Sequence, residues 1–384
     1  MKRAALWALL PLVLIVVVAL GFLASDPLRP FTGSAPPVEE LTIERTVLNG
    51  EGISMRIRAA GSEPMIIAQV QVDGAYWNFE QDPIGPIERM DTAWLKIPYP
   101  WVSGEAHHLA FVTNTGAVFE RSIDVAVASP ELTNDRLGFF ALIGLFVGVV
   151  PIALGMLFTP ALRAGGPGVF QFALALTIGL LAFLFVDTLA EGLEFAHEAA
   201  PQFQGAALVW LPAALTFAAL MMIGRRTGEA LSGVALATSI AFGIGIHNLG
   251  EGLAIGAAFA TGAAALGSFL VIGFTLHNIT EGIGIAAPMM ADRPRLKVFV
   301  LLALLAGLPA VIGIWIGSFA FSAHWAALAM GVGAGAILQV IIEVGAYLIR
   351  KSKTEGQGWA NWTIFAGIIL GIAIMYATAF LIQI

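Results

Sequence analysis

The chain divides into three stretches that differ in how their hydrophobic residues are spaced. An apolar run occupies residues 4–23, and residues 39–128 alternate apolar and polar positions in short runs. From residue 136 onward, long apolar segments are interrupted by brief charged ones. A period of two is typical of half-buried β-strands, whereas about 20 apolar residues suffice for one membrane-spanning helix. The pattern therefore predicts an apolar N-terminal helix, a β domain and a bundle of membrane helices.

The first apolar run follows Lys2 and Arg3, as in a signal peptide. Its length also suits a membrane span, and Ala24-Ser25-Asp26 fits a small-x-small cleavage site poorly. We therefore expect residues 1–24 to form an uncleaved membrane anchor, with a signal segment as the alternative. Residues 25–38 contain several prolines and are expected to form a linker.

The alternating stretch predicts an all-β sandwich domain over residues 39–130. Apolar side chains alternate with polar ones over residues 53–58 and again over 122–127. Asn49-Gly50 and Asp73-Gly74 are typical hairpin turns between such runs. About seven short strands in a segment of this length are typical of a sandwich.

The remaining segment, 136–384, predicts eight membrane-spanning helices, or nine with the anchor. Residues 298–342 contain no Lys, Arg, Asp or Glu, which leaves room for two of these spans. The predicted fold class is thus a mainly α membrane protein in which one anchor helix and an extracytoplasmic β sandwich precede an eight-helix bundle. The eight helices are expected at about 137–160, 168–198, 205–224, 231–260, 264–290, 296–319, 324–349 and 360–383.

Composition supports this fold class and excludes several functions. Hydrophobic residues make up 58% of the chain and charged residues 12%, against roughly 25% charged in a soluble domain. A net charge of -7 argues against nucleic acid as a partner, because cations are needed to neutralise phosphates. The absence of cysteine excludes disulfides, thiolate metal sites and cysteine nucleophiles.

Cations are distributed unevenly among the expected loops between core helices. Every second loop carries them, and the three loops between these carry no Lys or Arg. The positive-inside rule places the cationic loops in the cytoplasm. We therefore expect a multi-pass protein of the cytoplasmic (inner) membrane, surrounded by lipid, with its N-terminus inside and its β domain and C-terminus outside. The loop cations are Arg163, Arg225, Arg226, Arg293, Arg295, Lys297, Arg350, Lys351 and Lys353.

Two polar motifs thirty residues apart interrupt the apolar helices at 231–260 and 264–290. In each, a glutamate follows a histidine by four residues and an asparagine by three, so all three lie on one helix face. With a turn near residues 261–263, each histidine lies about 22 Å along its helix from the turn, near the middle of the bilayer. The six residues are His247, Asn248, Glu251, His277, Asn278 and Glu281.

These side chains suit a divalent first-row cation. Imidazole and carboxylate bind Zn²⁺, Fe²⁺, Mn²⁺ or Co²⁺, and the absence of thiolate argues against a dedicated Cu(I) site. A carboxylate at the middle of a bilayer costs about 2.5–3.5 kcal/mol, and two carboxylates would neutralise the charge of one such ion. The spacing therefore predicts an intramembrane metal site between the two helices.

The segments HNLGEGLAIG and HNITEGIGIAAP resemble the fourth- and fifth-helix motifs of the ZIP (Zrt/Irt-like) metal transporters, particularly the prokaryotic broad-range branch. The resemblance covers about 136–384. It implies import of divalent metal, Zn²⁺ first and Fe²⁺ or Mn²⁺ as alternatives, as substrate and without a resident cofactor. It also implies a main metal site formed by the histidines and glutamates, and an adjacent site in which the two asparagines join the same glutamates.

The sequence departs from the family pattern at two places in the core. Gly250 stands where relatives often have proline, and residues 307–310 lack the acidic residue that supports a second metal in many relatives. The second difference favours a single bound ion. The β domain is not a general family feature, so the resemblance implies no partner for it.

Further polar residues lie in the apolar helices. Asp187, Glu191 and Glu194 form one acidic stripe that could gather cations, with a solvated helix end as the alternative. Gln339 and Glu343 form an i, i+4 pair that could serve as an exit site or lie at the membrane interface. These residues are candidates for a metal pathway.

Other polar and small residues give weaker signals. His107 and His108 could capture metal in the β domain, although adjacent strand residues face opposite ways. His324 is expected at the membrane interface. Gly144-xxx-Gly148, residues 331–335 and Gly367-xxx-Gly371 provide packing faces, either inside the bundle or for a homodimer.

We expect a transporter rather than an enzyme. One alternative is an intramembrane metal-dependent hydrolase, but zinc proteases use His-Glu-x-x-His, and here asparagine follows each histidine. Another is a membrane-anchored metal-binding sensor whose β domain binds a partner. That alternative does not explain the intramembrane histidines and glutamates.

Overall fold

The computed structural model describes residues 13–22, 25, 38–226, 231–260, 264–290, 292, 294–354 and 361–382. Of the predicted N-terminal anchor, residues 13–22 form an apolar helix (Val13–Phe22). Most of the expected linker and the turn at residues 261–263 lie outside the described residues.

The alternating segment forms a sandwich of two four-stranded antiparallel sheets. The strand orders are β1-β2-β6-β5 and β4-β3-β7-β8. Hairpin turns follow Asn49 and Val72, where the sequence predicts them. The strands are β1 Leu41–Asn49, β2 Gly52–Ala59, β3 Ile67–Val72, β4 Ala75–Trp77, β5 Glu80–Asp82, β6 Thr92–Ile97, β7 His107–Thr113 and β8 Val118–Ile123.

Alternation along the strands builds the core of this domain. Ile53, Met55 and Ile57 on β2 are fully buried and pack with residues of the opposite sheet. The prediction of a strand across residues 122–127 is wrong in part, because β8 ends at Ile123. Beyond it, Ala126 is buried and its backbone bonds to the loop that precedes β7.

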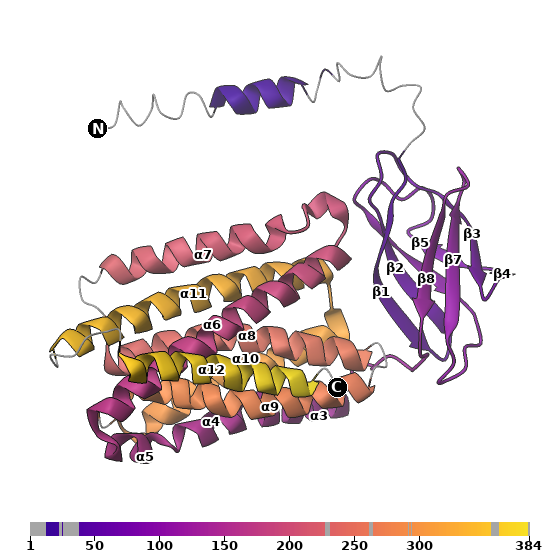
Figure 1. Cartoon of the computed structure of the whole chain (residues 1–384). Helices are drawn as coiled ribbons and strands as arrows, with labels where there is room; N and C mark the ends of the chain where they lie inside the picture. Colours follow the sequence, from indigo (N-terminus) through magenta and orange to yellow (C-terminus); the bar gives the residue numbers. More distant parts are fainter. Residues whose placement is uncertain are drawn as a thin grey trace.

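Eight helical spans follow that are long and apolar enough to cross a membrane, as expected. They run roughly parallel to one another (Figure 1). The first is built from three segments, α3 Asn134–Gly144, the π-helical turn η1 Leu145–Val149 and α4 Val150–Met156, and is followed by the short helix α5 Thr159–Ala164. The others are α6 Gly166–Glu198, α7 Ala207–Arg226, α8 Gly233–Ala260, α9 Ala264–Ala286, α10 Leu296–Ala320, α11 Ala323–Thr354 and α12 Trp362–Ile382, with 3-10 turns η2 Pro201–Phe203 and η3 Ala287–Met289.

Packing within the bundle falls mainly into two groups of helices. In one, α10 packs along α8 and against α3 and η1, and α9 packs on α4. In the other, α11 and α12 pack on α6, and α7 packs on α11. The groups meet where α8 contacts α11 and where α9 contacts α6 and α12.

Glycines allow the closest of these approaches. A Cβ built on Gly313 of α10 would lie 3.0 Å from the Cα of Gly252 on α8, and one built on Gly282 of α9 would lie 3.0 Å from the Cα of Gly155 on α4. The glycine motifs singled out in the sequence pack inside the bundle in the same way. Gly144 and Gly148 face α10, Gly331 and Gly335 face α7, and Gly367 and Gly371 face α6.

The β domain lies at one end of the bundle, beside the ends of α6 and α7 (Figure 1). The Arg58 guanidinium lies 5.4 Å from the ring centroid of Phe203 in η2. Phe203 in turn stacks on His324 at the start of α11, with 4.6 Å between ring centroids. Gln202 donates a hydrogen bond of 3.3 Å to Glu40. These contacts attach the domain to the α6–α7 and α10–α11 connections.

Candidate metal centre

The two polar motifs lie on neighbouring helices, α8 and α9, as their spacing predicts. Both helices continue through the motifs, so residues three and four apart share a face. All six predicted side chains are buried, with exposed fractions of 3% or less, and they are His247, Asn248, Glu251, His277, Asn278 and Glu281.

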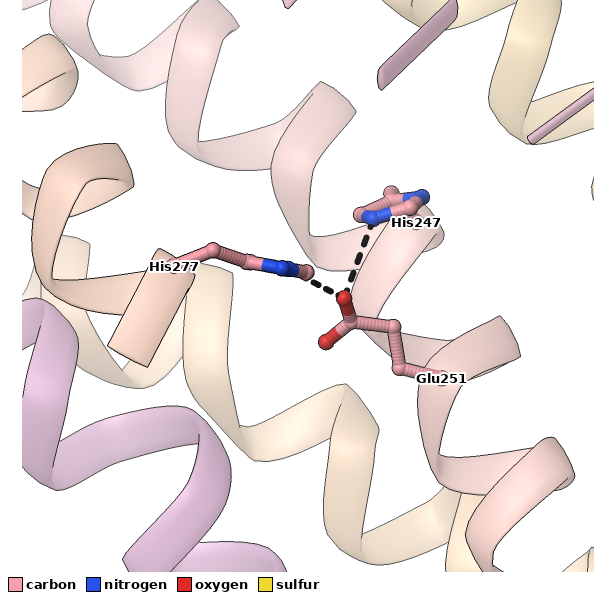
Figure 2. Close-up of side chains that lie close together, drawn as sticks. All are labelled: His247, Glu251 and His277. Carbon is pink, nitrogen blue, oxygen red and sulfur yellow. Dashed lines mark ion pairs between the residues drawn. The ribbon is translucent and has the colours of Figure 1, made fainter. Parts of the chain in front are cut away.

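Glu251 is the centre of the cluster (Figure 2). Its Oε1 lies 3.2 Å from Nε2 of His247 on the same helix and closer still to Nε2 of His277 on α9. One donor atom from each of the three residues lies within 4.8 Å of the others. One small cation could therefore contact all three after minor adjustment.

Each asparagine links its own helix to the glutamate of the other. Asn248 donates to Glu281 Oε2 (3.5 Å) and Asn278 donates to Glu251 Oε2 (3.4 Å). Each amide also donates to a backbone carbonyl of a third helix, Asn248 to Ala306 at 3.0 Å and Asn278 to Val147 at 3.0 Å. With its nitrogen used in this way, each side chain has its carbonyl oxygen Oδ1 free.

Each of the six residues also has one buried polar atom without a hydrogen-bond partner. Three of these atoms, from His247, Glu251 and His277, contact one another as ion pairs. The other three are oxygens of Asn248, Asn278 and Glu281, for which the described residues supply no hydrogen-bond partner. Buried polar atoms are nearly always paired, so three such oxygens beside an ion-paired cluster need an explanation. The six atoms are Nε2 of His247 and His277, Oδ1 of Asn248 and Asn278, and Oε1 of Glu251 and Glu281.

Glu281 lies apart from the group of three. The resemblance implies that it belongs to the main site, but the group of mutually close donor atoms is made by His247, Glu251 and His277. Glu281 is joined to it through Asn248, and its own Oε1 is buried and unpaired. The structure therefore brings three of the four expected main ligands together and holds the fourth beside them.

Sequence reasoning missed two residues that support the site. Thr188 on α6 is fully buried, and its hydroxyl lies 2.8 Å from Nδ1 of His247. The Val147 carbonyl is available to Asn278 because Pro151, four residues later, has no N–H to donate to it. Pro151 was the signal available in the sequence, since a proline within a helix leaves the carbonyl four residues earlier without its helical partner. The structure adds a π-helical turn just before it, and such turns often occur at functional sites.

The acidic residues of α6 approach the cluster from one side. Asp187 and Glu191 are half-buried, and both lie within electrostatic reach of His247 and Glu251. Glu194, one turn farther along the stripe, is exposed. Asp187 adjoins Thr188, which contacts His247, so it lies at the level of the cluster, and Glu191 lies one turn nearer the end of α6 that meets the β domain.

Gln339 and Glu343 lie away from the cluster in the other direction. Gln339 is buried and accepts a hydrogen bond from Ser239 of α8 (3.3 Å). Ser239 precedes His247 by eight residues, or about 12 Å along the helix. Glu343 is half-buried one turn beyond Gln339. The structure therefore places Gln339 beside α8 between the start of that helix and the cluster, with Glu343 one turn farther away, and neither residue belongs to the cluster.

The histidines of the β domain do not form a shared site, as the strand geometry predicts. His107 is buried, with Nδ1 2.9 Å from Asp73, whereas His108 is exposed and lies 3.6 Å from Glu120. Burial tends to raise the pKa of Asp73, but hydrogen bonds from the His108 backbone, His107 and Tyr99 lower it below its ordinary value. The bond to Asp73 raises the pKa of the Tyr99 hydroxyl.

Comparison of the chain with protein-family models and with curated proteins finds no match.

Proposed function

We propose that this protein imports divalent transition-metal ions across the cytoplasmic membrane, with the cluster on α8 and α9 as the site that holds the ion in transit. The observation that carries the proposal is the buried group of His247, Glu251 and His277, whose donor atoms lie within 4.8 Å of one another. Beside it, one buried oxygen each of Asn248, Asn278 and Glu281 has no hydrogen-bond partner. A cation would supply a partner for these imidazole, carboxylate and carboxamide groups.

Charge supports the same conclusion. Two carboxylates buried in an apolar bundle are costly, and a divalent cation would neutralise both. The imidazole and carboxylate groups of the cluster, without any thiolate, favour Zn²⁺, with Fe²⁺ and Mn²⁺ as alternatives, over Cu(I). The resemblance of the two motifs to those of ZIP transporters leads to the same substrate class.

Polar residues on both sides of the cluster support a path through the bundle. Asp187 lies beside it, Glu191 lies one turn nearer the β domain, and Ser239, Gln339 and Glu343 flank it in the other direction. The positive-inside rule favours the cytoplasm for the second direction. In this proposal metal enters past α6 and leaves past Gln339, and the protein is not an enzyme.

The test is uptake of a panel of divalent metals into proteoliposomes. We expect Glu251→Gln to reduce uptake of the transported metal by more than the roughly 10–100-fold that loss of an outer partner costs a metal site. Glu281→Gln should reduce it as well. Glu131→Gln is the matched control, because Glu131 is exposed just before α3 and far along the chain from the cluster.

Wild-type protein that binds metal yet moves none under any ion gradient would contradict the proposal. So would uptake that survives both substitutions in the cluster. The first result would favour a metal-binding sensor, and the second would place the permeation path elsewhere in the bundle.

A further inference from the structure

Thr188 connects α6 to the metal cluster. Its side chain is fully buried, and Oγ1 lies 2.8 Å from Nδ1 of His247. The two residues belong to different groups of helices, because α6 packs mainly on α11 and α12 whereas α8 packs on α10. The contact is therefore a polar link from the second group of helices to a residue of the site.

The methyl group of Thr188 faces Gly333 of α11. Its carbon would lie 3.6 Å from a Cβ built on Gly333, and the backbone nitrogen of His247 would lie 3.8 Å from the same point. Both are ordinary contact distances, so the three residues pack side by side. Because a threonine side chain has few rotamers, a methyl group on this side leaves the hydroxyl to point toward the imidazole.

The proposed metal site requires a lone pair on Nε2 of His247, which lies 3.2 Å from Oε1 of Glu251. A neutral imidazole carries one proton, and the other nitrogen then presents a lone pair. If Thr188 donated to Nδ1, Nε2 would carry the proton and could not bind metal. Metal binding at Nε2 therefore requires Nδ1–H to donate to Thr188.

A threonine that accepts from His247 must place its own hydroxyl hydrogen elsewhere. A threonine within a helix often donates to the carbonyl four residues earlier. Thr177, on the same helix, does so with Ala173 at 2.9 Å. The bond that the structure shows for the Thr188 hydroxyl is the one to His247, so an acceptor role requires the hydroxyl hydrogen to turn toward the backbone in the same way.

We propose that Thr188 is a positioning residue that accepts the Nδ1–H of His247 and holds this imidazole in the tautomer whose Nε2 can bind metal. The proposal rests on the function proposed above and deepens it. Outer-shell hydrogen bonds of this kind fix the tautomer and orientation of metal-binding histidines in general. Here the partner comes from a helix outside the two that carry the motifs.

Three substitutions separate this role from simple packing. Thr188→Val keeps the shape and removes the hydroxyl, whereas Thr188→Ser keeps the hydroxyl and removes the methyl group. A positioning role requires serine to preserve function and valine to lose it, and a packing role requires the reverse order. Thr177→Val is the matched control, because Thr177 is equally buried on α6 but bonds to its own helix.

The first measurement is equilibrium zinc binding to the purified full-length chain, by competition with a chromophoric chelator. We expect Thr188→Val to weaken binding by about 10–100-fold. Thr188→Ser and Thr177→Val should stay close to wild type. Equal losses for valine and serine, or wild-type affinity for Thr188→Val, would overturn the proposal.

The second measurement is ¹⁵N NMR of histidine-labelled, metal-free protein, with the His247 signals assigned by their loss in His247→Gln. The wild-type spectrum should show His247 protonated at Nδ1, and Thr188→Val should show a mixture of tautomers. A wild-type ring protonated at Nε2 would refute the inference even if zinc is transported. If both measurements follow expectation but proteoliposomes take up no metal, the inference stands and the transport function fails.

Discussion

At the scale of single residues, hydrogen bonds keep one partly exposed carboxyl group of the β domain ionised. Asp73, at a tight turn of the β domain, accepts bonds from the His108 backbone (2.8 Å), His107 (2.9 Å) and Tyr99 (2.8 Å). Together they hold its pKa below the ordinary value despite the opposing effect of burial. The ionised carboxylate therefore joins β3, β7 and the segment after β6.

We expect Asp73→Asn to loosen this part of the sandwich in a pH-dependent way. A carboxyl group with a lowered pKa stabilises the fold above its unfolded-state pKa, and this stabilisation disappears as the pH falls through the lowered folded-state value. Hydrogen exchange of β7 amides should therefore be faster in the variant than in wild type at pH 7. The two should converge at a pH below the folded-state pKa. A difference that stays constant with pH would show that the charge of Asp73 is not responsible.

The sequence predicts the residues of the two motifs, but it does not predict the hydrogen-bond partners that hold them in place. Spacing places His247, Asn248 and Glu251 on one helix face, and this needs only the helical period. Thr188 is 59 positions away from His247, and no local pattern connects them. Likewise, the anchor of Asn278 on the Val147 carbonyl depends on how two helices pack, which periodicity does not determine.

At the scale of elements, the backbones of α8 and α10 pack tightly against each other beside the site. A Cβ on Gly313 would lie 2.9 Å from the backbone nitrogen of Leu253 and 3.0 Å from the Cα of Gly252. Both neighbours are backbone atoms, so they cannot relieve the contact by a change of rotamer as a side chain could. Small residues at such positions let membrane helices pack tightly.

We expect Gly313→Ala to destabilise the bundle by about 1–3 kcal/mol, as overpacking does in other cores. Gly345→Ala is the matched control, because a Cβ there meets no atom within 4 Å and alanine favours a helix over glycine. Thermal unfolding of the detergent-solubilised chain should show a lower midpoint for the first variant. For the second, the midpoint should be unchanged or higher. Equal midpoints for both variants would mean that α8 and α10 can separate at little cost.

The sequence predicts the positions of the eight helical spans well, but it does not predict the irregular turns and very short elements. Long apolar runs set the eight spans, because an apolar segment of that length has few alternatives to a helix in lipid. The π-helical turn Leu145–Val149 and the short helix after it interrupt the first span without any change in hydropathy. In the β domain, the three-residue strands β4 and β5 are too short to show a period.

At the scale of the whole molecule, the β domain is attached through a small set of contacts around Phe203. Arg58 lies over one face of the ring and His324 stacks on it, so one side chain joins the domain to two connections of the bundle. A cation–π contact contributes about 0.5–1 kcal/mol at exposed sites and more when shielded from water. This single contact is therefore a modest part of the attachment.

We expect Phe203→Ala to loosen the docking of the β domain. The chain has no cysteine, so a pair of spin labels can be attached to one variant that carries both Glu88→Cys in the β domain and His197→Cys at the end of α6. Their distance distribution should broaden in Phe203→Ala and stay narrow in Phe365→Ala, which removes an exposed ring from α12. An unchanged distribution in Phe203→Ala would show that other contacts hold the domain.

The closely packed backbones of α8 and α10 have a mechanical consequence for the site on α8 and α9. A displacement of α8 along its axis would carry α10 with it, and with α10 the Ala306 carbonyl that anchors Asn248. Thr188 belongs to the other group of helices, because α6 packs mainly on α11 and α12. Sliding of one group past the other would therefore leave the Asn248 anchor intact and stretch the bond from Thr188 to His247. The length of that bond would report the relative position of the two groups.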